Sequence, residues 1–168
     1  MPGTPRLGTM TITGLTTFLW FDTEAEQAAN LYVSTFPGSR ITGISHYQLD
    51  AQKRAGEVLT VDFELFGQSF ACINAGPDFP HSPAVSFQVF CDTQDEIDRL
   101  WDTLTADGGE PGRCGWCKDR FGVSWQVIPR NLSALLGAGG EAGARAFGAM
   151  MGMGKLDIAG LQSAAAGG

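Results

Sequence analysis

The sequence predicts an α+β fold built from two tandem βαβββ-type modules, the second one shortened. Two repeated patterns lead to this prediction. An apolar stretch that runs into Asp-Thr and a helix start occurs at residues 18–26 and again at 87–96. A second pattern, Gly-x-Ser-aromatic-x-x-Ile, occurs at 67–73 and at 122–128, after each helix. Two matches in the same order indicate a duplicated module.

The two helix starts share a capping pattern. In each copy a Glu follows three residues after the Thr of Asp-Thr, which gives the pairs Thr23/Glu26 and Thr93/Glu96. In such a capping box the Thr side chain accepts a hydrogen bond from the backbone of the Glu, and the Glu side chain bonds back to the backbone of the Thr. The sequence therefore predicts the same local start for both helices.

The first module is expected to span residues 12–76. Its helix shows an apolar stripe at the spacing of an amphipathic helix and ends at Pro37-Gly38. The strand at 58–66 alternates apolar and polar side chains, as a strand with one face in water does. The predicted elements are a strand at 13–21, a helix from 24 to 36, and strands at 40–49, 58–66 and 69–74.

Three prolines mark residues 77–83 as the linker, because proline is excluded from the interior of helices and strands. The second module, 84–130, is short by roughly a hairpin. Its predicted elements are a strand at 84–90, a helix ended by Gly108-Gly109, and strands at 113–118 and 122–128. The Gly/Ala-rich tail at 131–168 should form short helices that pack on the domain or on a partner subunit, with a partly disordered tail as the alternative.

The composition fits one ordinary domain or two small modules that share a core. The chain has 168 residues and a net charge of −7, without a Lys/Arg cluster that would indicate a nucleic-acid partner. No apolar run approaches the roughly 20 residues of a membrane span, and the first ten residues lack the apolar segment of a secretory signal. We therefore expect a cytoplasmic protein with reduced cysteines, no nucleic-acid partner and no membrane association.

Several motifs together identify a known family. They are Leu19-Trp-Phe-Asp, Phe36-Pro-Gly, the strand at 58–65, Gly67-Gln-Ser-Phe, Asn74-Ala-Gly-Pro, Ser86-Phe-Gln-Val, Cys114-Gly-Trp, the run at 118–129 and the tail segment at 150–161. With these motifs the chain resembles the PhnB-like branch of the vicinal oxygen chelate superfamily, a branch also described as 3-demethylubiquinone-9 3-methyltransferase-like. The superfamily includes glyoxalases, bleomycin resistance proteins and dioxygenases. The resemblance implies two modules whose sheets curl around a ligand cavity, and a homodimer.

Metal enzymes of this superfamily place His, Gln or Glu ligands on the opening and last strands of the modules. The corresponding positions here are Thr17, Ala84, Ala71 or Cys72, and Gln126. A divalent ion needs about three or four converging ligands, and only Gln126 is a plausible one. The two histidines, His46 and His81, lie elsewhere. We therefore expect no metal and no cofactor, with a divalent-metal-dependent lyase, isomerase or dioxygenase of the glyoxalase type as the alternative.

The methyltransferase name is a weaker guide to activity. Methyl transfer from S-adenosylmethionine commonly uses a Gly-rich turn between a strand and a helix, and neither predicted helix follows such a turn. The late glycines at 137–140 follow no predicted strand. Methyltransferase activity is therefore the less favoured alternative.

The spacing of Cys114 and Cys117 is that of a redox motif. We place both in a strand, where residues three apart point to opposite faces, so the thiols would diverge. A zinc site would need two further ligands, for which Cys72 or Cys91 with a histidine is an unspecific set. Redox chemistry is not favoured.

A ligand cavity with a few polar groups remains the leading hypothesis. If Gln126 points inward, as the resemblance implies, Ser124 shares its face and Trp125 points away to pack beneath a helix. No nucleophile–base arrangement is visible, so we predict no catalytic residue and leave open whether the protein is an enzyme. The alternative of another class is a sequestration or interaction module. The candidate cavity residues are Thr17, Asn74, Gln88, Trp116, Ser124 and Gln126.

Overall fold

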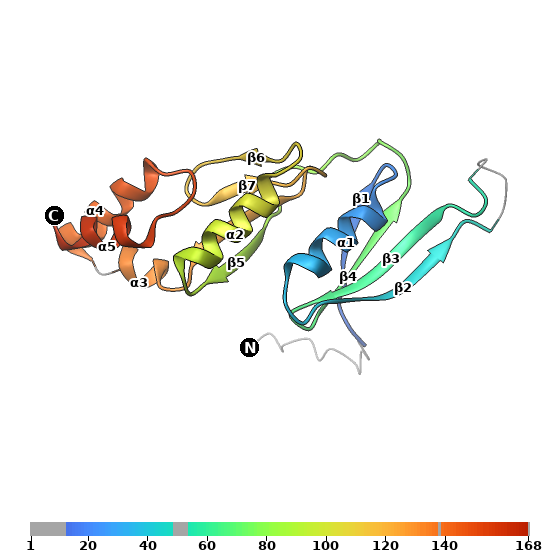
Figure 1. Ribbon diagram of the computed structural model, residues 1–168, viewed down its shortest axis with the longest axis horizontal. Coiled ribbons are helices and arrows are strands. Elements are labelled where there is room, and N and C mark those ends of the chain that lie inside the picture. Colours follow the sequence, from blue (N-terminus) through green and yellow to red (C-terminus); the bar gives the residue numbers. More distant parts are fainter. Residues whose placement is uncertain (1–12, 49–53, 138, 168) are drawn as a thin grey trace, which may run out of the picture.

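The computed structural model describes residues 13–48, 54–137 and 139–167. Two four-stranded mixed sheets lie side by side along the long axis, each with one helix across the same side (Figure 1). Three short helices gather at the far end of the second sheet. The sheets do not close into a barrel. The predicted fold class, two tandem modules followed by short C-terminal helices, is confirmed.

The first module has the strand order β1-β4-β3-β2, with β1 parallel to β4 and the other pairs antiparallel. The first strand is shorter than predicted, because it begins at Thr17 rather than at residue 13. The predicted end of β2 at residue 49 lies outside the described residues. The elements are β1 Thr17–Phe21, α1 Ala25–Thr35, β2 Arg40–His46, β3 Val58–Leu65 and β4 Gln68–Asn74.

The second module repeats this topology, with the order β5-β8-β7-β6 and β5 parallel to β8. Its shortening comes from β6 and β7, which are present but have only two and three residues. The strand predicted at 113–118 begins only at Trp116. Cys114 and Gly115 both have positive φ and form a turn before it. The elements are β5 Phe87–Cys91, α2 Gln94–Thr105, β6 Glu110–Pro111, β7 Trp116–Lys118 and β8 Ser124–Pro129.

The two long helices begin differently. Helix α2 has the predicted capping box, in which Thr93 Oγ1 accepts from the Glu96 backbone N–H at 3.2 Å and Glu96 accepts from that of Thr93 at 3.0 Å. Helix α1 has no such box, so this prediction is wrong for the first helix. There the side chain of Asn74, at the end of β4, accepts from the Ala25 backbone N–H at 2.8 Å and takes the place of a local cap.

Aromatic side chains join the two modules in one core. The ring of Trp125 on β8 lies 5.2 Å from that of Tyr32 and 5.3 Å from that of Phe36, at the C-terminal half of α1 and just after it. Phe70 of the first sheet contacts Phe87 of the second, with ring centroids 5.4 Å apart. The modules therefore do not fold as separate domains with separate cores. Trp125 packs against a helix, as predicted, and that helix belongs to the other module.

A buried carboxylate also crosses this junction. Asp119 is 2% exposed, and its Oδ2 accepts hydrogen bonds from Tyr32 Oη at 2.8 Å and from Trp125 Nε1 at 2.9 Å. Its Oδ1 accepts from the backbone N–H groups of Phe121 and Val123. Burial, and next the negative charge of Asp119, raise the pKa of Tyr32 well above its ordinary value, so the phenol stays a donor.

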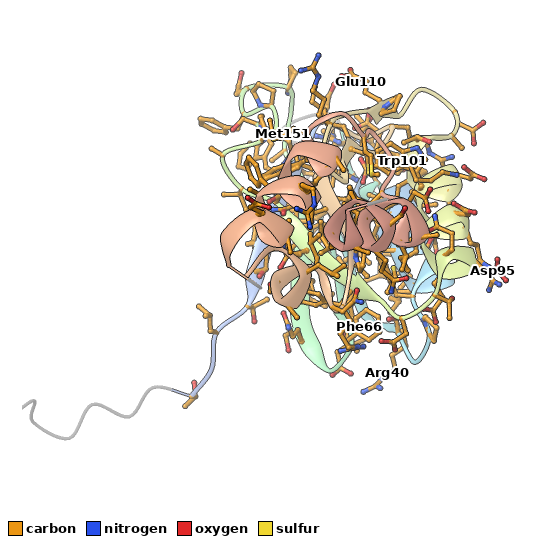
Figure 2. All side chains as sticks on the ribbon, turned by 90° about the vertical axis from the view of Figure 1, so that its left-hand side faces the viewer. Arg40, Phe66, Asp95, Trp101, Glu110 and Met151 are labelled. Carbon is orange, nitrogen blue, oxygen red and sulfur yellow. The ribbon has the colours of Figure 1, made fainter. Side chains whose placement is uncertain are left out.

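The C-terminal helices form a second, smaller apolar cluster at the end of the second sheet. Figure 2 looks onto this end and shows the helices lying across it, with Met151 and Trp101 labelled. Leu156 and Leu161 are buried there against Ile128 of β8. The helices are α3 Leu132–Leu136, α4 Gly140–Met151 and α5 Ile158–Ala166. In the part of the chain that the structure describes, no helix has the length and apolarity needed to cross a membrane.

Candidate functional site

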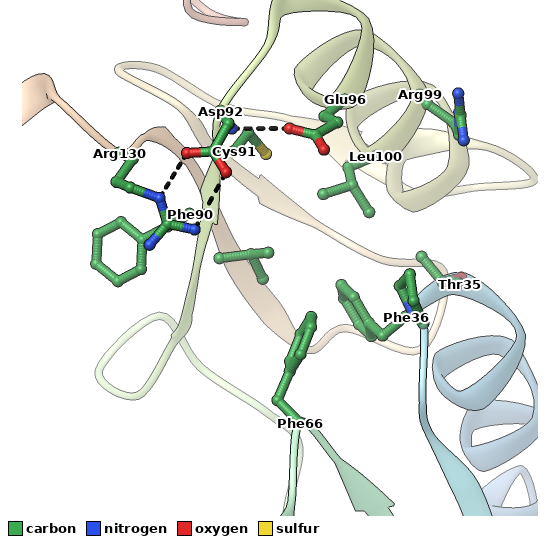
Figure 3. A pocket seen from close by; sticks show the side chains of 12 residues that line it. Thr35, Phe36, Phe66, Phe90, Cys91, Asp92, Glu96, Arg99, Leu100 and Arg130 are labelled. Carbon is green, nitrogen blue, oxygen red and sulfur yellow. Dashed lines mark hydrogen bonds and ion pairs between the residues drawn. The ribbon is translucent and has the colours of Figure 1, made fainter.

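A groove runs between the two modules beside β5, the edge strand of the second sheet (Figure 3). It consists of two adjoining cavities of about 280 Å³ and 190 Å³, which share Phe36, Phe66 and Val89. Phe66 lies in the turn between β3 and β4 and has a positive φ of 50°. The centroid of its ring is 5.7 Å from that of Phe36. The middle of the groove is therefore apolar and largely aromatic.

Polar side chains are concentrated at the two ends of the groove. The wider end carries an ion pair between Arg130 and Asp92, with Nε and Oδ1 2.5 Å apart. Beside it, Glu96 accepts from the backbone N–H groups of Asp92 and Thr93, and these bonds lower its pKa. The narrower end carries three polar side chains, those of Gln68, Ser86 and Gln88.

Three predicted site residues form one row across the second sheet. Gln126 on β8 pairs in register with Gln88 on β5 and with Trp116 on β7. Gln88 Nε2 donates to Gln126 Oε1 at 3.1 Å, and Gln126 Nε2 donates to Ser86 Oγ at 2.8 Å. Val127, which follows Gln126 in the chain, is buried in the core. Strand alternation therefore puts Gln126, and the row with it, on the opposite, open face of the sheet. Gln88 belongs to both the row and the groove.

Asn74 lies in the interior and holds backbone together. It is 4% exposed, its Oδ1 caps α1, and its Nδ2 donates to the Val58 carbonyl at 3.0 Å. Its own carbonyl accepts from Tyr47 Oη at 2.6 Å. These contacts account for the amide without a ligand, and its contact with one stays a prediction.

The structure separates Thr17 and Ser124 from the glutamine row. Thr17 starts β1 on the same side of the strand as Leu19 and Phe21, which are buried in the core. Ser124 has the same strand parity as Gln126, as predicted, but it is 2% exposed and lines a different cavity beneath the linker. Their contacts with a ligand stay predictions.

The side chains at the superfamily's metal positions do not fit a resident divalent ion. Gln126 Oε1 already accepts from Gln88. Burial raises the pKa of Cys72 to about 12, and its thiol donates to the carbonyls of Ala25 and Val61. Within residues 13–48, 54–137 and 139–167, no three His, Cys, Asp or Glu side chains are grouped so that they could hold a metal ion. We therefore derive no chemistry through a metal.

The Cys-x-x-Cys motif does not bring two thiols together. Cys114 lies in the turn before β7 and packs against the C-terminal cluster, with its sulfur 3.7 Å from that of Met151 on α4. Cys117 is buried in the shared core, and burial raises its pKa to about 12. Both cysteines are free. The placement of Cys114 in a strand was wrong, but the two thiols do diverge.

The residues of the groove were not predicted as site residues, except Gln88. Phe36 and Phe66 each end an element directly before a Pro-Gly or a Gly, where an apolar ring has no local partner. That position is the signal that could have identified them. Arg130 and Asp92 follow β8 and β5, and because these strands are parallel neighbours, their ends meet at one edge of the sheet.

Comparison with known proteins gives a consistent result. Residues 13–128 match the model of the family described as 3-demethylubiquinone-9 3-methyltransferase. The structure of the PhnB protein from Bacillus cereus is 36% identical, with 68% of this chain and 98% of that chain covered and a TM-score of 0.62. A Pseudomonas aeruginosa protein is 19% identical, with 68% and 96% covered and a TM-score of 0.55, and shows the fold alone. No curated protein matches.

Proposed function

Because the chain belongs to the 3-demethylubiquinone-9 3-methyltransferase family, in its PhnB-like branch, we propose that it binds a small organic molecule in the groove between its modules, without a metal ion. We further propose that it does so as a cytoplasmic homodimer. The observation that carries the proposal is the groove itself, an aromatic middle with polar groups at both ends.

The groove has the character of a small-molecule site. Such sites are concave and mostly apolar, with a few polar groups that fix the orientation of the ligand. Phe66, 62% exposed, offers its ring to a planar or aliphatic body, and the buried ring of Phe36 packs against it with centroids 5.7 Å apart. Gln88, held by Gln126, offers an amide at one end, and the Arg130–Asp92 pair offers charge at the other. An elongated organic molecule with a polar group at each end matches this arrangement.

The family name does not supply the reaction. A methyl donor with a carboxylate or phosphate group would be met by free N–H groups at a helix N-terminus. At α1 the Ala25 N–H is bonded to Asn74, and at α2 the Glu96 N–H is bonded to Thr93. One backbone N–H at the start of each helix is thus already bonded to a side chain of the protein itself. We therefore propose binding and no methyl transfer.

The metal-dependent alternative is tested by measuring the metal content of the purified protein. Purified protein, prepared without chelator, should contain less than about one tenth of an equivalent of zinc, manganese or iron by elemental analysis, since the donor set lacks the about three or four ligands a site requires. A stoichiometric metal that is lost in Gln126→Ala would replace our proposal with the alternative. Under that alternative, Gln126→Ala should also abolish turnover.

Binding to the groove is tested with 1-anilinonaphthalene-8-sulfonate, an aromatic anion whose fluorescence rises in apolar sites. We expect saturable binding of about one molecule per chain, weakened at least about fivefold in Phe66→Ser, which removes a ring that lines both cavities. The matched control is Phe147→Ser, because Phe147 on α4 is similarly exposed, 51% against 62% for Phe66. Equal loss in both variants, or loss in neither, would contradict the proposed site.

The homodimer is tested separately by measuring the molar mass of the protein by light scattering as it elutes from a size-exclusion column. Exposed rings such as Phe18 and Phe90, 57% and 49% exposed, give the apolar surface that a second copy could cover. The expected mass is twice the 17.8 kDa of one chain. A single-chain mass at micromolar concentration would refute the dimer and leave the binding proposal intact.

A further inference from the structure

A further cavity, distinct from the two that form the groove, lies beneath the linker that joins the two modules. It has a volume of about 180 Å³, and Phe87 is the one side chain it shares with the groove as lined above. Its wall comes from both modules and from the linker that passes over them. The lining residues are Leu19, Pro80, His81, Ser82, Val85, Phe87, Val123 and Ser124.

A buried hydroxyl without a partner lines this cavity. Ser124, at the start of β8, is 2% exposed. Among the described residues its Oγ has no hydrogen-bond partner. Buried polar groups in proteins are nearly always bonded to protein, water or ligand, so such a hydroxyl indicates a bound partner. No local structural role accounts for it, since a serine that only caps or turns the chain bonds to nearby backbone.

A second residue that lines the cavity, His81, also has a buried polar atom without a partner among the described residues, which supports a bound molecule here. Within the part of the chain that the structure describes, His81 Nε2 is buried and has no hydrogen-bond partner either. The His81 ring packs 5.0 Å from that of Phe21, which fixes it at the cavity wall. Burial lowers the pKa of His81, against smaller opposing effects of Asp119 and of the Trp20 backbone, so the ring is neutral at pH 7.

The chemistry of the wall defines the class of occupant. Leu19, Val85 and Phe87 present hydrocarbon, which favours an apolar body and disfavours a net charge. A neutral imidazole nitrogen and a serine hydroxyl can each donate or accept, depending on tautomer and rotamer, and a hydroxyl group on the occupant can satisfy either. We propose that this cavity binds a small neutral molecule with a hydroxyl group on an apolar body.

The size of the cavity agrees with such a molecule. An engineered protein cavity of about 150 Å³ is known to bind benzene, so a cavity of this volume accommodates a single six-membered ring with one polar substituent. The site is independent of the groove, since the polar groups of the groove, at Gln88 and Arg130, do not line it.

Phenol is the probe, and the two histidines of the chain are the reporters. On the full chain, the imidazole proton signals of His81 and His46 are followed by NMR during titration with phenol and, separately, with benzene. We expect phenol to shift the His81 signal saturably and to leave His46 unchanged, with benzene binding at least about tenfold more weakly. This comparison uses the unaltered protein, so it does not depend on any variant folding.

Ser124→Ala removes the hydroxyl and keeps the packing. We expect the phenol Kd to rise at least about tenfold in Ser124→Ala and to stay unchanged in Ser69→Ala, which removes an exposed serine hydroxyl from β4. The proposal is overturned if phenol up to about 20 mM leaves His81 unaffected, or if benzene binds as tightly as phenol. It is equally overturned if Ser124→Ala binds phenol like the parent, or if a crystal soaked in phenol shows only ordered water in the cavity.

Discussion

The phenol of Tyr32 donates a hydrogen bond to the buried carboxylate of Asp119 at 2.8 Å, across the junction of the two modules. The two residues are 87 positions apart in the chain. This bond and the packing of Trp125 against Tyr32 fix the first helix on the second sheet. The groove lies on the same junction, so its shape depends on this contact.

Removing the carboxylate should loosen the junction. Asp119→Ala leaves four donors unpaired, three of them buried, and we expect a loss of about 3–5 kcal/mol of unfolding free energy in urea. Tyr32→Phe removes one bond and should cost about 1–2 kcal/mol. The control is Asp107→Asn, which breaks an exposed ion pair with Arg120, keeps a side chain that tolerates the φ of 53° at this position, and should cost less than about 1 kcal/mol. Similar losses in Asp119→Ala and Asp107→Asn would refute the role of Asp119.

The two helix starts should respond to different substitutions. Asn74→Ala removes the cap of α1 and the bond to Val58, so we expect a cost of about 2–4 kcal/mol. Thr93→Ala breaks the capping box of α2 and should cost about 1 kcal/mol. Thr23→Ala should change the stability by less than about 0.5 kcal/mol, because its side chain caps nothing. A cost for Thr23→Ala equal to that of Thr93→Ala would instead support a local box at both helices.

Thiol labelling should distinguish one cysteine from three. Cys114 is half-buried, whereas Cys72, Cys91 and Cys117 are buried, and burial raises their pKa values to about 12, 11 and 12. At pH 8 we expect one thiol to react quickly with a disulfide reagent and three to react only on unfolding, since the thiolate is the reactive form. Cys114→Ser should remove the fast phase. Two fast thiols, or an intramolecular disulfide in the product, would contradict this assignment.

Stability should fall in alkaline solution. The three buried thiols have folded pKa values above their ordinary value of 9.0, so between about pH 9 and 12 the folded chain holds protons that the unfolded chain has lost. Their contribution is fully present below about pH 9 and declines as pH rises, by at most about 1.4 kcal/mol per pH unit for each group. Urea unfolding at pH 8, 9 and 10 measures the decline, and Cys91→Ala should reduce its slope. A flat profile would show that these thiols are not buried.

The repeated patterns were sufficient to predict the two modules, and strand alternation predicted that Ser124 shares the face of Gln126. The row itself was not predicted, because the pairing of Gln88 with Gln126 depends on the register of β5 against β8, which alternation within one strand does not give. The bond between Tyr32 and Asp119 is long-range, and no periodicity carries it. Asn74 was singled out because a buried amide needs partners, but its position gave no information on whether those partners were ligand or backbone.

The linker explains most of what the sequence did not predict at the site. Its prolines indicate that it is irregular, and an irregular segment has no periodicity from which its path can be read. It crosses over Ser124 and separates that residue from Gln126, two positions further along the same strand. The shared face was predicted from alternation, and the division of that face into two environments depends on tertiary structure alone.

The cap of the first helix also sets an order of events during synthesis. Helix α1 leaves the ribosome early, but the amide that completes its first turn is 49 residues further along the chain. At about 5–20 residues per second this separation takes several seconds, and an isolated helix of eleven residues is marginal in water. Helix α2 carries its capping residues with it. The nascent chain therefore forms a stable first helix only once β4 has emerged, whereas the second can be capped as soon as it is made.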